Sequence, residues 1–444
     1  MHKRVAFYTL GCKVNAVESD VLAATFQQRG YKLVDFKEKS DIYVINTCTV
    51  THKADAQCRK IIRQTRKKSP EAVIAVIGCY AQADPHAISM LPGVDLILGN
   101  GEKYAIFEHL NNNSCPEGDT SCFTEPVIHT GFRINPFEGE KEMAYPKGTL
   151  RVGTWRTRAF LKVQDGCSYK CSYCIIPFVR GPSVCRDKND VLNRAKAIRD
   201  AGFKEIVITA VNLGEYRNGS GYRLIHLMKD LCAIPDIPRI RLTSIEPNCI
   251  SEELIKFIAG SGVICPHFHV PLQSGSDAIL KKMRRKYSTK KYAQIMEWIK
   301  MYLPDAAVGA DVMVGFPGET DALFEESADF VREMPVTYLH VFRYSPRSGT
   351  HALNFSYTIP PQVSHARSQK MIGIGLKKKE QFLRNQIGKT VDVLFESNRN
   401  NGSYEGFTRN YVRVQCSDAA KANSLKHALI TGKSGFVLKG HVVS

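Results

Sequence analysis

The chain has 444 residues, a length that accommodates two to four domains of ordinary size. Its hydrophobic fraction of 43% is typical of a globular protein, and because no apolar run is long enough to cross a bilayer we expect a cytoplasmic protein with no membrane partner. Lys and Arg outnumber Asp and Glu by 61 to 43, and the resulting net charge of +18 favours a polyanionic partner, with nucleic acid ahead of an anionic membrane surface.

Residues 1–115 are predicted to form an N-terminal α/β domain with a parallel sheet, because apolar runs alternate with helical segments. The first helix is expected to begin at Asn15, which precedes Glu18 by three residues in the pattern of a capping pair. Thr51 is expected to cap a second, basic helix. The strand-like runs are Val5–Tyr8, Ile42–Ile45, Ala72–Ile77 and Leu96–Leu98.

The middle of the chain divides into two parts. Residues 116–150 contain Asn, Gly and Pro but few sustained apolar runs, which indicates a linker or an irregular extension. In residues 151–384 strand-like runs recur at intervals of roughly 30 to 45 residues, as repeated strand–helix units require, and six units predict an incomplete (β/α) barrel. These runs are Phe160–Val163, Glu205–Thr209, Arg239–Thr243, Cys265–Val270, Val308–Val314 and Tyr338–Phe342.

The end of the chain is different in character. The segment Gln362–Arg384 is predicted to be a basic helix, and residues 386–444 alternate short strands with Gly, Asn and Ser. This pattern suggests a small β-barrel. Its expected strands include Val391–Phe395, Tyr411–Val414 and Phe436–Leu438.

Fourteen cysteines are many for a cytoplasmic chain, and the cytosol keeps thiols reduced, so metal ligation, catalysis and core packing are more plausible than a disulfide framework. Cys167, Cys171 and Cys174 form a C-x3-C-x2-C triplet after the first predicted barrel strand, at the end where barrel active sites lie. Thiolates are the normal ligands of iron–sulfur clusters, and three of them leave one iron of a four-iron cluster open. The alternative is a zinc knuckle or a group of core thiols, although zinc usually takes four ligands.

Three further cysteines share a position relative to predicted strands. Cys12, Cys48 and Cys79 each come just after an apolar strand of the N-terminal domain. The carboxyl ends of parallel strands meet at one edge of a sheet, so these thiols are predicted to converge on a second metal centre. Buried structural cysteine is the alternative for any one of them, but the shared register favours a site for all three.

These features together resemble a known family. The triplet, with Tyr173 before its third cysteine, resembles the radical S-adenosylmethionine signature, and nearly the whole chain is similar to the methylthiotransferase family, with a terminal barrel that resembles the RNA-binding TRAM domain. The chain departs from the family pattern at Val17, where an aromatic residue is frequent, and at Cys185, where a polar residue is usual. The segments that carry the resemblance are Gly11–Asn15, Asn46–Cys48, Gly78–Cys79, Gly166–Pro177, Pro271–Gly275, Gly315–Glu319 and Gly406–Tyr411.

The resemblance implies an enzyme with two [4Fe-4S] clusters. The cluster on Cys167, Cys171 and Cys174 would cleave S-adenosylmethionine to a 5′-deoxyadenosyl radical, and the cluster on the other three cysteines would supply or carry sulfur. The expected partners are a tRNA substrate and a small electron-transfer protein that acts as reductant. The chain is expected to be a monomer. The residues that match the family's cofactor-binding segments are Tyr173, Asn212, Glu246, Gln273, Ser274 and Gly315; their alternative role is to shape the turns at the barrel mouth.

The segment Gly11–Asn15 resembles the branch that modifies N6-threonylcarbamoyladenosine at position 37 of tRNA, and 2-methylthiolation of that base is the predicted reaction. The alternatives are the N6-isopentenyladenosine base, a ribosomal protein substrate, and a non-enzymatic RNA-binding iron–sulfur protein. Because the threonyl carboxylate is costly to bury unpaired, Lys13 and Arg343 are candidates to meet it. Phe407 and Tyr411 are predicted either to stack on bases or to pack in the barrel core, and His267 and His269 are expected to pack inside the central barrel.

Overall fold

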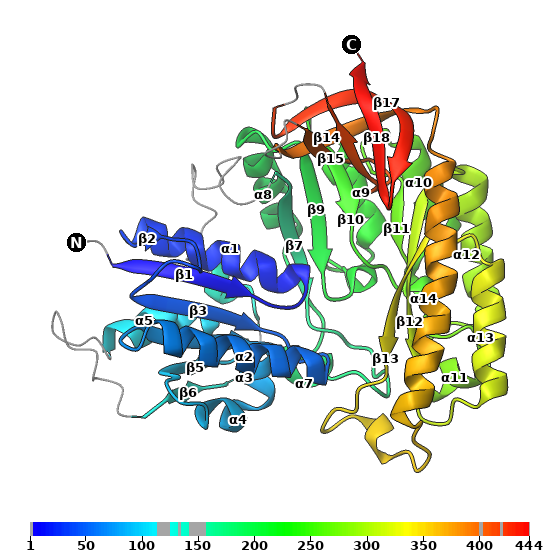
Figure 1. Ribbon diagram of the computed structural model, residues 1–444. Helices are drawn as coiled ribbons and strands as arrows, with labels where there is room; N and C mark the ends of the chain where they lie inside the picture. Colours follow the sequence, from blue (N-terminus) through cyan, green and yellow to red (C-terminus); the bar gives the residue numbers. More distant parts are fainter. Residues whose placement is uncertain are drawn as a thin grey trace.

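The computed structural model describes residues 3–112, 125–131, 135–141, 157–398, 403–417 and 421–443. Three units lie side by side in it: an N-terminal sheet, a central open barrel and a C-terminal closed barrel (Figure 1). This is the mixed α/β architecture that the sequence predicts. Within the described ranges, no helix combines the length and the apolar character needed to span a membrane.

The N-terminal sheet has the strand order β2-β1-β3-β4-β5-β6, and every neighbouring pair is parallel. Its last strand and α6 come from the stretch expected to be a linker, so part of that stretch belongs to this unit. Apolar clusters cover both faces of the sheet. The elements are β1 (Arg4–Thr9), α1 (Lys13–Gln28), β2 (Lys32–Leu33), β3 (Ile42–Thr47), α2 (His52–Lys68), β4 (Val73–Gly78), α3 (Cys79–Ala83), α4 (Pro85–Ser89), β5 (Leu96–Leu98), η1 (Lys103–Ala105), α5 (Ile106–Asn112), β6 (Val127–His129) and α6 (Glu138–Lys141).

The start of α1 corrects one prediction. Cys12 occupies the N-cap position, and Asn15 lies inside the helix, where its amide donates to the carbonyls of Leu10 (2.8 Å) and Thr47 (2.9 Å). The capping-pair interpretation was wrong because both polar side chains are used for tertiary contacts: Asn15 holds two strand ends together, and Glu18 is fully buried among cations. The cap at Thr51 is confirmed, since its hydroxyl accepts from the backbone N–H of Ala54.

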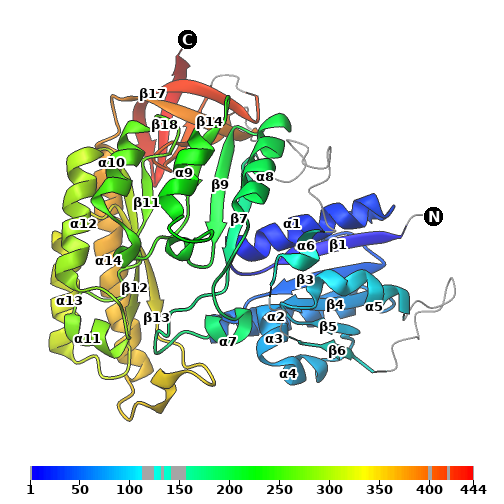
Figure 2. The same ribbon diagram turned by 180° about the vertical axis from the view of Figure 1, so that it is seen from behind.

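The central barrel consists of two sheets, β10-β9-β7-β8 and β11-β12-β13, joined by isolated bridges between β10 and the β11 region. Six strands are parallel, and only the short β8 runs against β7. The helices cover the outside, and the carboxyl ends of the strands point away from the C-terminal barrel (Figures 1 and 2). The elements are β7 (Ala159–Asp165), α7 (Ile176–Arg180), β8 (Val184–Cys185), α8 (Lys188–Asp200), β9 (Glu205–Ala210), η2 (Leu213–Glu215), α9 (Leu224–Cys232), β10 (Arg239–Leu242), η3 (Pro247–Cys249), α10 (Glu252–Gly260), β11 (His267–His269), α11 (Asp277–Lys282), α12 (Thr289–Tyr302), β12 (Ala307–Val314), α13 (Asp321–Glu333), β13 (Tyr338–Arg343), η4 (His351–Asn354) and α14 (Pro361–Arg384).

The C-terminal unit is a closed barrel of order β14-β15-β16-β18-β17, as the sequence predicts. It sits against the amino ends of the central strands, where the guanidinium of Arg239 donates to the carbonyl of Phe407 (2.9 Å). The strand expected at Tyr411 begins later, because Tyr411 has a φ of 66° and forms a turn. The elements are β14 (Thr390–Asn398), β15 (Tyr404–Thr408), β16 (Arg413–Cys416), β17 (Ser424–Ser434) and β18 (Val437–Val443).

Candidate functional site

The triplet of cysteines lies in the loop that connects β7 to α7, at the carboxyl end of the barrel. The loop is fixed by its own backbone: the N–H of Cys167 donates to the carbonyl of Gly181, and that of Cys174 to the carbonyl of Cys171. The buried Ser172 anchors the loop to the end of α11 through its hydroxyl, which donates to the carbonyl of Lys282 (2.8 Å). The three thiols therefore belong to a loop that is held by its own backbone hydrogen bonds and by a hydrogen bond to the end of α11.

Several predicted cofactor residues surround this triplet. Arg285 donates to the Sγ of Cys171 (3.2 Å) and the hydroxyl of Tyr173 (3.4 Å), and it forms an ion pair with Glu246. Burial raises the pKa of Glu246, although Arg285 opposes that shift. The amide nitrogen of Asn212 lies 3.7 Å from the Sγ of Cys167, while its buried Oδ1 has no hydrogen-bond partner among the described residues. A polar ligand beside the triplet would satisfy that oxygen.

The other three predicted cofactor residues lie where backbone geometry is demanding. Gln273 has a φ of 64° and bridges to β12, and the hydroxyl of the buried Ser274 accepts from the N–H of Ser276. Gly315 has a φ of 72°, and a Cβ there would lie 2.7 Å from the Cβ of Ser364 in α14. These contacts explain a structural need for each residue, so their cofactor roles stay predictions.

The second group of cysteines lies at the edge of the N-terminal sheet. Cys12, Cys48 and Cys79 follow β1, β3 and β4, which are neighbours in the sheet, so the three residues lie at adjacent strand ends. Packing there is tight: a Cβ at Gly11, whose φ is 101°, would lie 3.1 Å from the Sγ of Cys48. Asn100 donates to the Sγ of Cys79 at 3.6 Å. The three strand ends are therefore neighbours, and the role of the thiols as ligands stays a prediction.

The two thiol groups are neighbours across the joint between the units. Helix α3, which begins at Cys79, packs on α7, which follows Cys174, and the side chains of Cys79, Ile175 and Val179 form a small buried cluster. Arg180 at the end of α7 donates to Asn15 (2.6 Å) in the first turn of α1, the helix that Cys12 caps.

The spacing of the thiols distinguishes between metal centres. Among the described residues, the only His, Cys, Asp or Glu ligand atoms that gather in a group of three within 4.8 Å of one another are those of His269, Asp311 and His340, so neither thiol group converges that closely. A single zinc ion with bonds of about 2.3 Å would need sulfur atoms about 3.8 Å apart. Neither group is therefore closed to the distances of a single zinc site among the described residues.

Burial disfavours the thiolate form of several of these cysteines. Burial raises the pKa of Cys48, Cys167 and Cys174 to about 12. Only a bound cationic centre would make thiolates favourable there, because metal ligation requires deprotonation. The chemistry of these sites therefore fits metal-cluster ligands better than free nucleophiles.

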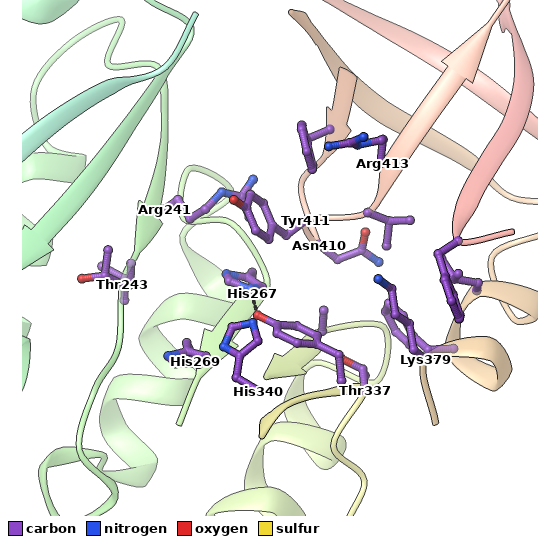
Figure 3. A pocket seen from close by; sticks show the side chains of 18 of the residues that line it. Arg241, Thr243, His267, His269, Thr337, His340, Lys379, Asn410, Tyr411 and Arg413 are labelled. Atoms are coloured by element: carbon purple, nitrogen blue, oxygen red, sulfur yellow. Dashed lines mark hydrogen bonds between the residues drawn. The ribbon is translucent and has the colours of Figure 1, made fainter. Parts of the chain in front are cut away.

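A cavity of about 530 Å³ lies between the central barrel and the C-terminal barrel (Figure 3), and Lys13 at the start of α1 also lines it. Its wall contains four cations and three imidazoles and no carboxylate among the described lining residues. The cations and imidazoles are Lys13, Arg241, Lys379, Arg413, His267, His269 and His340. An anion or a polar substrate arm is the chemistry that such a wall would accept.

The cavity also shows what the aromatic residues of the C-terminal barrel do. Phe407 and Tyr411 are half-buried, stack on each other at 5.1 Å and line the cavity rather than the core of their own barrel. His267 and His269 line the same cavity, so they are not simple packing residues. Lys13 is at the cavity wall, whereas the exposed Arg343 is not among its described lining residues.

Comparison with known proteins agrees with this geometry. Residues 4–99 match the family described as "Uncharacterized protein family UPF0004", and residues 161–331 match the radical SAM superfamily. The chain is 35% identical over 416 residues to the "Threonylcarbamoyladenosine tRNA methylthiotransferase MtaB" of Bacillus subtilis (strain 168), covering 92% of this chain and 89% of that protein. The chain belongs to the radical S-adenosylmethionine methylthiotransferase family. As a member of the radical S-adenosylmethionine superfamily, this methylthiotransferase uses a [4Fe-4S] cluster and S-adenosylmethionine.

Other relatives of the methylthiotransferase lie further away. The "tRNA-2-methylthio-N(6)-dimethylallyladenosine synthase" of Bartonella henselae is 31% identical over 416 residues, covering 91% of this chain and 88% of its own. The radical S-adenosylmethionine methyltransferase TsrM from Kitasatospora setae, solved with cobalamin and a [4Fe-4S] cluster, has a TM-score of 0.55 at 16% identity, covering 78% of this chain and 74% of that chain. The latter likeness concerns the fold alone.

Sequence reasoning missed two arginines of the site. Arg285, which contacts Cys171, lies 114 residues from it, and Arg180, which reaches Asn15, lies 165 residues from that residue. Arg285 lies in a basic run that is typical of a solvated surface, and Arg180 is the last residue of the short helix α7. The proximity of Arg180 to the cysteine triplet was the one available signal.

Proposed function

We propose that this methylthiotransferase adds a methylthio group to C2 of N6-threonylcarbamoyladenosine at position 37 of tRNA. The observation that carries the choice of substrate is the cationic cavity without a lining carboxylate, because the threonyl arm is anionic and an isopentenyl arm is apolar. The relatives named for the threonylcarbamoyl base support it: those of Bacillus subtilis and Aquifex aeolicus are 35% and 34% identical, against 31% for the dimethylallyl relative of Bartonella henselae.

The residues at the carboxyl end of the barrel would hold the cofactors. Cys167, Cys171 and Cys174 would ligate a [4Fe-4S] cluster, which together with S-adenosylmethionine supplies a 5′-deoxyadenosyl radical able to activate an inert C–H bond. Arg285 donates to the Cys171 sulfur and would stabilise its thiolate. Glu246 and Asn212 offer a carboxylate and a free amide oxygen beside the triplet, suited to the polar groups of S-adenosylmethionine.

The residues at the edge of the N-terminal sheet would hold a second [4Fe-4S] cluster, a proposal supported by the adjacent strand ends that Cys12, Cys48 and Cys79 follow. That centre would carry the sulfur to be transferred. Its position next to α7 supports the transfer, because the radical site and the sulfur site would face the same substrate. A small electron-transfer protein is proposed as the reductant, and a single chain as the working unit.

The test offers the holoenzyme two matched anticodon stem-loops under anaerobic conditions. One carries N6-threonylcarbamoyladenosine and the other N6-isopentenyladenosine, and nucleoside mass spectrometry measures both methylthio products. We expect a preference of at least about 100-fold in kcat/KM for the first, since an apolar arm leaves the cationic wall unpaired. A preference for the isopentenyl base would overturn the substrate while leaving the family standing.

A further inference from the structure

The wall of the cavity contains cations of two kinds. Arg241 uses its donors on protein acceptors, pairing with Glu205 and donating to the carbonyls of Thr408 and Arg409. Lys379 lies 4.8 Å from the ring centre of Phe436. Arg241 thus bonds the C-terminal barrel to the central barrel, and Lys379 packs against an aromatic ring of the C-terminal barrel.

Lys13 is different. It is exposed and lines the cavity, and unlike Lys379 and Arg413, which lie over aromatic rings, it has no hydrogen bond, ion pair or aromatic contact with any residue that the structure describes. Burial would raise the pKa of Tyr411, but nearby cations lower it, Arg158 most of all. Lys13 is among these cations, so its charge acts on the cavity. An unpaired ammonium on a wall that lacks carboxylates is available to an incoming anion.

Two buried polar residues of the cavity wall carry an atom without a hydrogen-bond partner among the described residues. Thr243 is 9% exposed and His267 is 6% exposed, and the Oγ1 of the first and the Nδ1 of the second have no hydrogen-bond partner among the described residues. Both residues line the cavity (Figure 3). The other ring nitrogen of His267 bonds the hydroxyl of Tyr338 at 2.8 Å, which fixes the ring. Buried polar atoms are rarely left unsatisfied, so a polar ligand is expected to reach them.

The position of Lys13 gives the ligand an orientation. Lys13 directly follows Cys12, one of the three thiols proposed to hold the sulfur-bearing centre, and it begins the 16-residue helix α1. In adenine, N1 lies between C2 and C6, the carbon that carries the N6 nitrogen, so C2 and N6 lie on the same edge of the base. If C2 of the base approaches the centre at Cys12, the N6 substituent on the same edge of the base lies beside the residues next to Cys12.

We infer that Lys13 is the specificity-determining cation of this enzyme, and that it binds the carboxylate of the substrate's threonyl arm while Thr243 and His267 bond the arm's hydroxyl and carbamoyl groups. This inference rests on the proposed function. Lys13 selects the substrate because an arm without a carboxylate offers the ammonium no counter-charge, and no carboxylate is among the described lining residues. Arg343 has no part in this recognition.

The test compares substrates that differ only in charge. Anticodon stem-loops carrying the threonylcarbamoyl base and its threoninamide analogue, in which the carboxylate is an amide, are offered to the holoenzyme, to Lys13→Met, to Lys13→Arg and to the control Lys60→Met on the exposed face of α2. The wild type should prefer the acid by about 10- to 100-fold in kcat/KM, the range for a charge-assisted hydrogen bond. Lys13→Met should abolish the preference by lowering turnover of the acid alone, Lys13→Arg should restore part of it, and Lys60→Met should keep it.

Equilibrium binding of both stem-loops and iron content are measured for the same variants. Turnover of the acid and the amide at equal rates by the wild type would overturn the inference while leaving the proposed function intact. Equal losses on both substrates in Lys13→Met would also overturn it, and would indicate an RNA phosphate contact if iron content is normal or a role at the Cys12 centre if iron is lost. If only the isopentenyl stem-loop is modified, the proposed function fails first and the inference falls with it.

Discussion

The two ends of the central barrel are built from different chemistry. The carboxyl end gathers thiols, with Arg285 and Glu246 beside the triplet and a second thiol group on the adjoining sheet. The amino end is closed by the C-terminal barrel and contains cations, imidazoles and stacked aromatic rings. The cavity extends from this second end to Lys13, one residue from Cys12.

This difference separates reaction from recognition along one barrel axis. Groups at the carboxyl end can hold metal and cofactor, and their loss should stop the reaction regardless of which RNA is bound. Groups at the amino end offer positive charge and aromatic surface for stacking. Their loss should reduce affinity for the RNA and selectivity among substrates without abolishing the reaction. Variants at the two ends can therefore test whether the separation holds.

The largest effect is expected from the two thiol groups. Cys171→Ala should abolish cleavage of S-adenosylmethionine and product formation, because an incomplete ligand set loses the cluster. Cys48→Ala should retain part of the cleavage yet yield no methylthio product. Chromatography of 5′-deoxyadenosine and mass spectrometry of the tRNA nucleosides measure both, with Cys232→Ala on α9 as the control thiol. Full product from the Cys48 variant would remove the N-terminal sheet from the chemistry.

Iron content sharpens the same comparison. Anaerobically reconstituted wild-type protein should contain about eight irons per chain, and each of the two variants about four. A wild type with four irons that Cys12→Ala does not change would show that only the loop triplet binds a cluster.

The next effect concerns the joint between the units. Arg180 donates to Glu18 (2.9 Å), Asp165 (2.9 Å) and Asn15 (2.6 Å), and all three acceptors are buried. Burial alone would raise the pKa of Glu18, but Arg180, Lys103 and Lys162 hold that pKa well below its usual range. Both carboxylates are therefore charged and depend on their partners.

Arg180→Met should lower the free energy of local opening around α1 and β7 by about 1–3 kcal/mol, because it removes charge-assisted hydrogen bonds from two buried carboxylates that keep Lys103 and Lys162 as their remaining cations. The exposed pair Arg199–Asp200 provides the control, and Arg199→Met should cost about 1 kcal/mol or less. Hydrogen exchange measured on peptides from the two elements separates this local effect from global unfolding, which need not be two-state in a chain of several units. Equal protection in Arg180→Met and wild type would contradict it.

The sequence predicted the elements that depend on local order. The loop triplet could be found because its three thiols lie within eight residues, Cys167–Cys174, after a recognisable strand. The strand-end thiols could be found because parallel strands share an edge, although the adjacency of β1, β3 and β4 had to come from the structure. What could not be predicted depends on long-range pairing: the tertiary use of Asn15, the contacts of Arg180 and Arg285, and the addition of β6 to the sheet.

A smaller effect is expected at the cofactor pocket. Glu246→Gln should raise the KM for S-adenosylmethionine by about tenfold, since a neutral amide replaces the carboxylate and leaves Arg285 without its counter-ion. Cluster absorbance should be unchanged, because Glu246 bonds Arg285 rather than a cysteine. Binding of the tRNA serves as the internal control and should not change. An unaltered KM for S-adenosylmethionine would reduce Glu246 to a residue that shapes the barrel mouth.

The smallest effect is expected at the amino end, and the packing there decides how it should be tested. Truncation after Arg384 should weaken tRNA binding and its salt dependence, but it would also remove the carbonyls of Thr408 and Arg409 that Arg241 bonds. Those losses would leave a buried guanidinium partly unpaired and perturb the central barrel as well. Single substitutions on the C-terminal barrel avoid this confusion.

Arg413 is exposed at the cavity, 5.5 Å from the ring centre of Phe407, whereas Lys426 is exposed on β17 and does not line the cavity. Arg413→Gln should reduce the slope of log affinity against log salt by about 1, the loss of one phosphate contact, with a severalfold fall in affinity. Lys426→Gln should leave the slope unchanged. Because counterion release depends on charge and not on base identity, both anticodon stem-loops should respond to Arg413→Gln equally, unlike the selective response expected from Lys13. An unchanged salt slope in Arg413→Gln would mean that RNA does not approach the barrel from this side, and that the cationic cavity is reached from the N-terminal sheet.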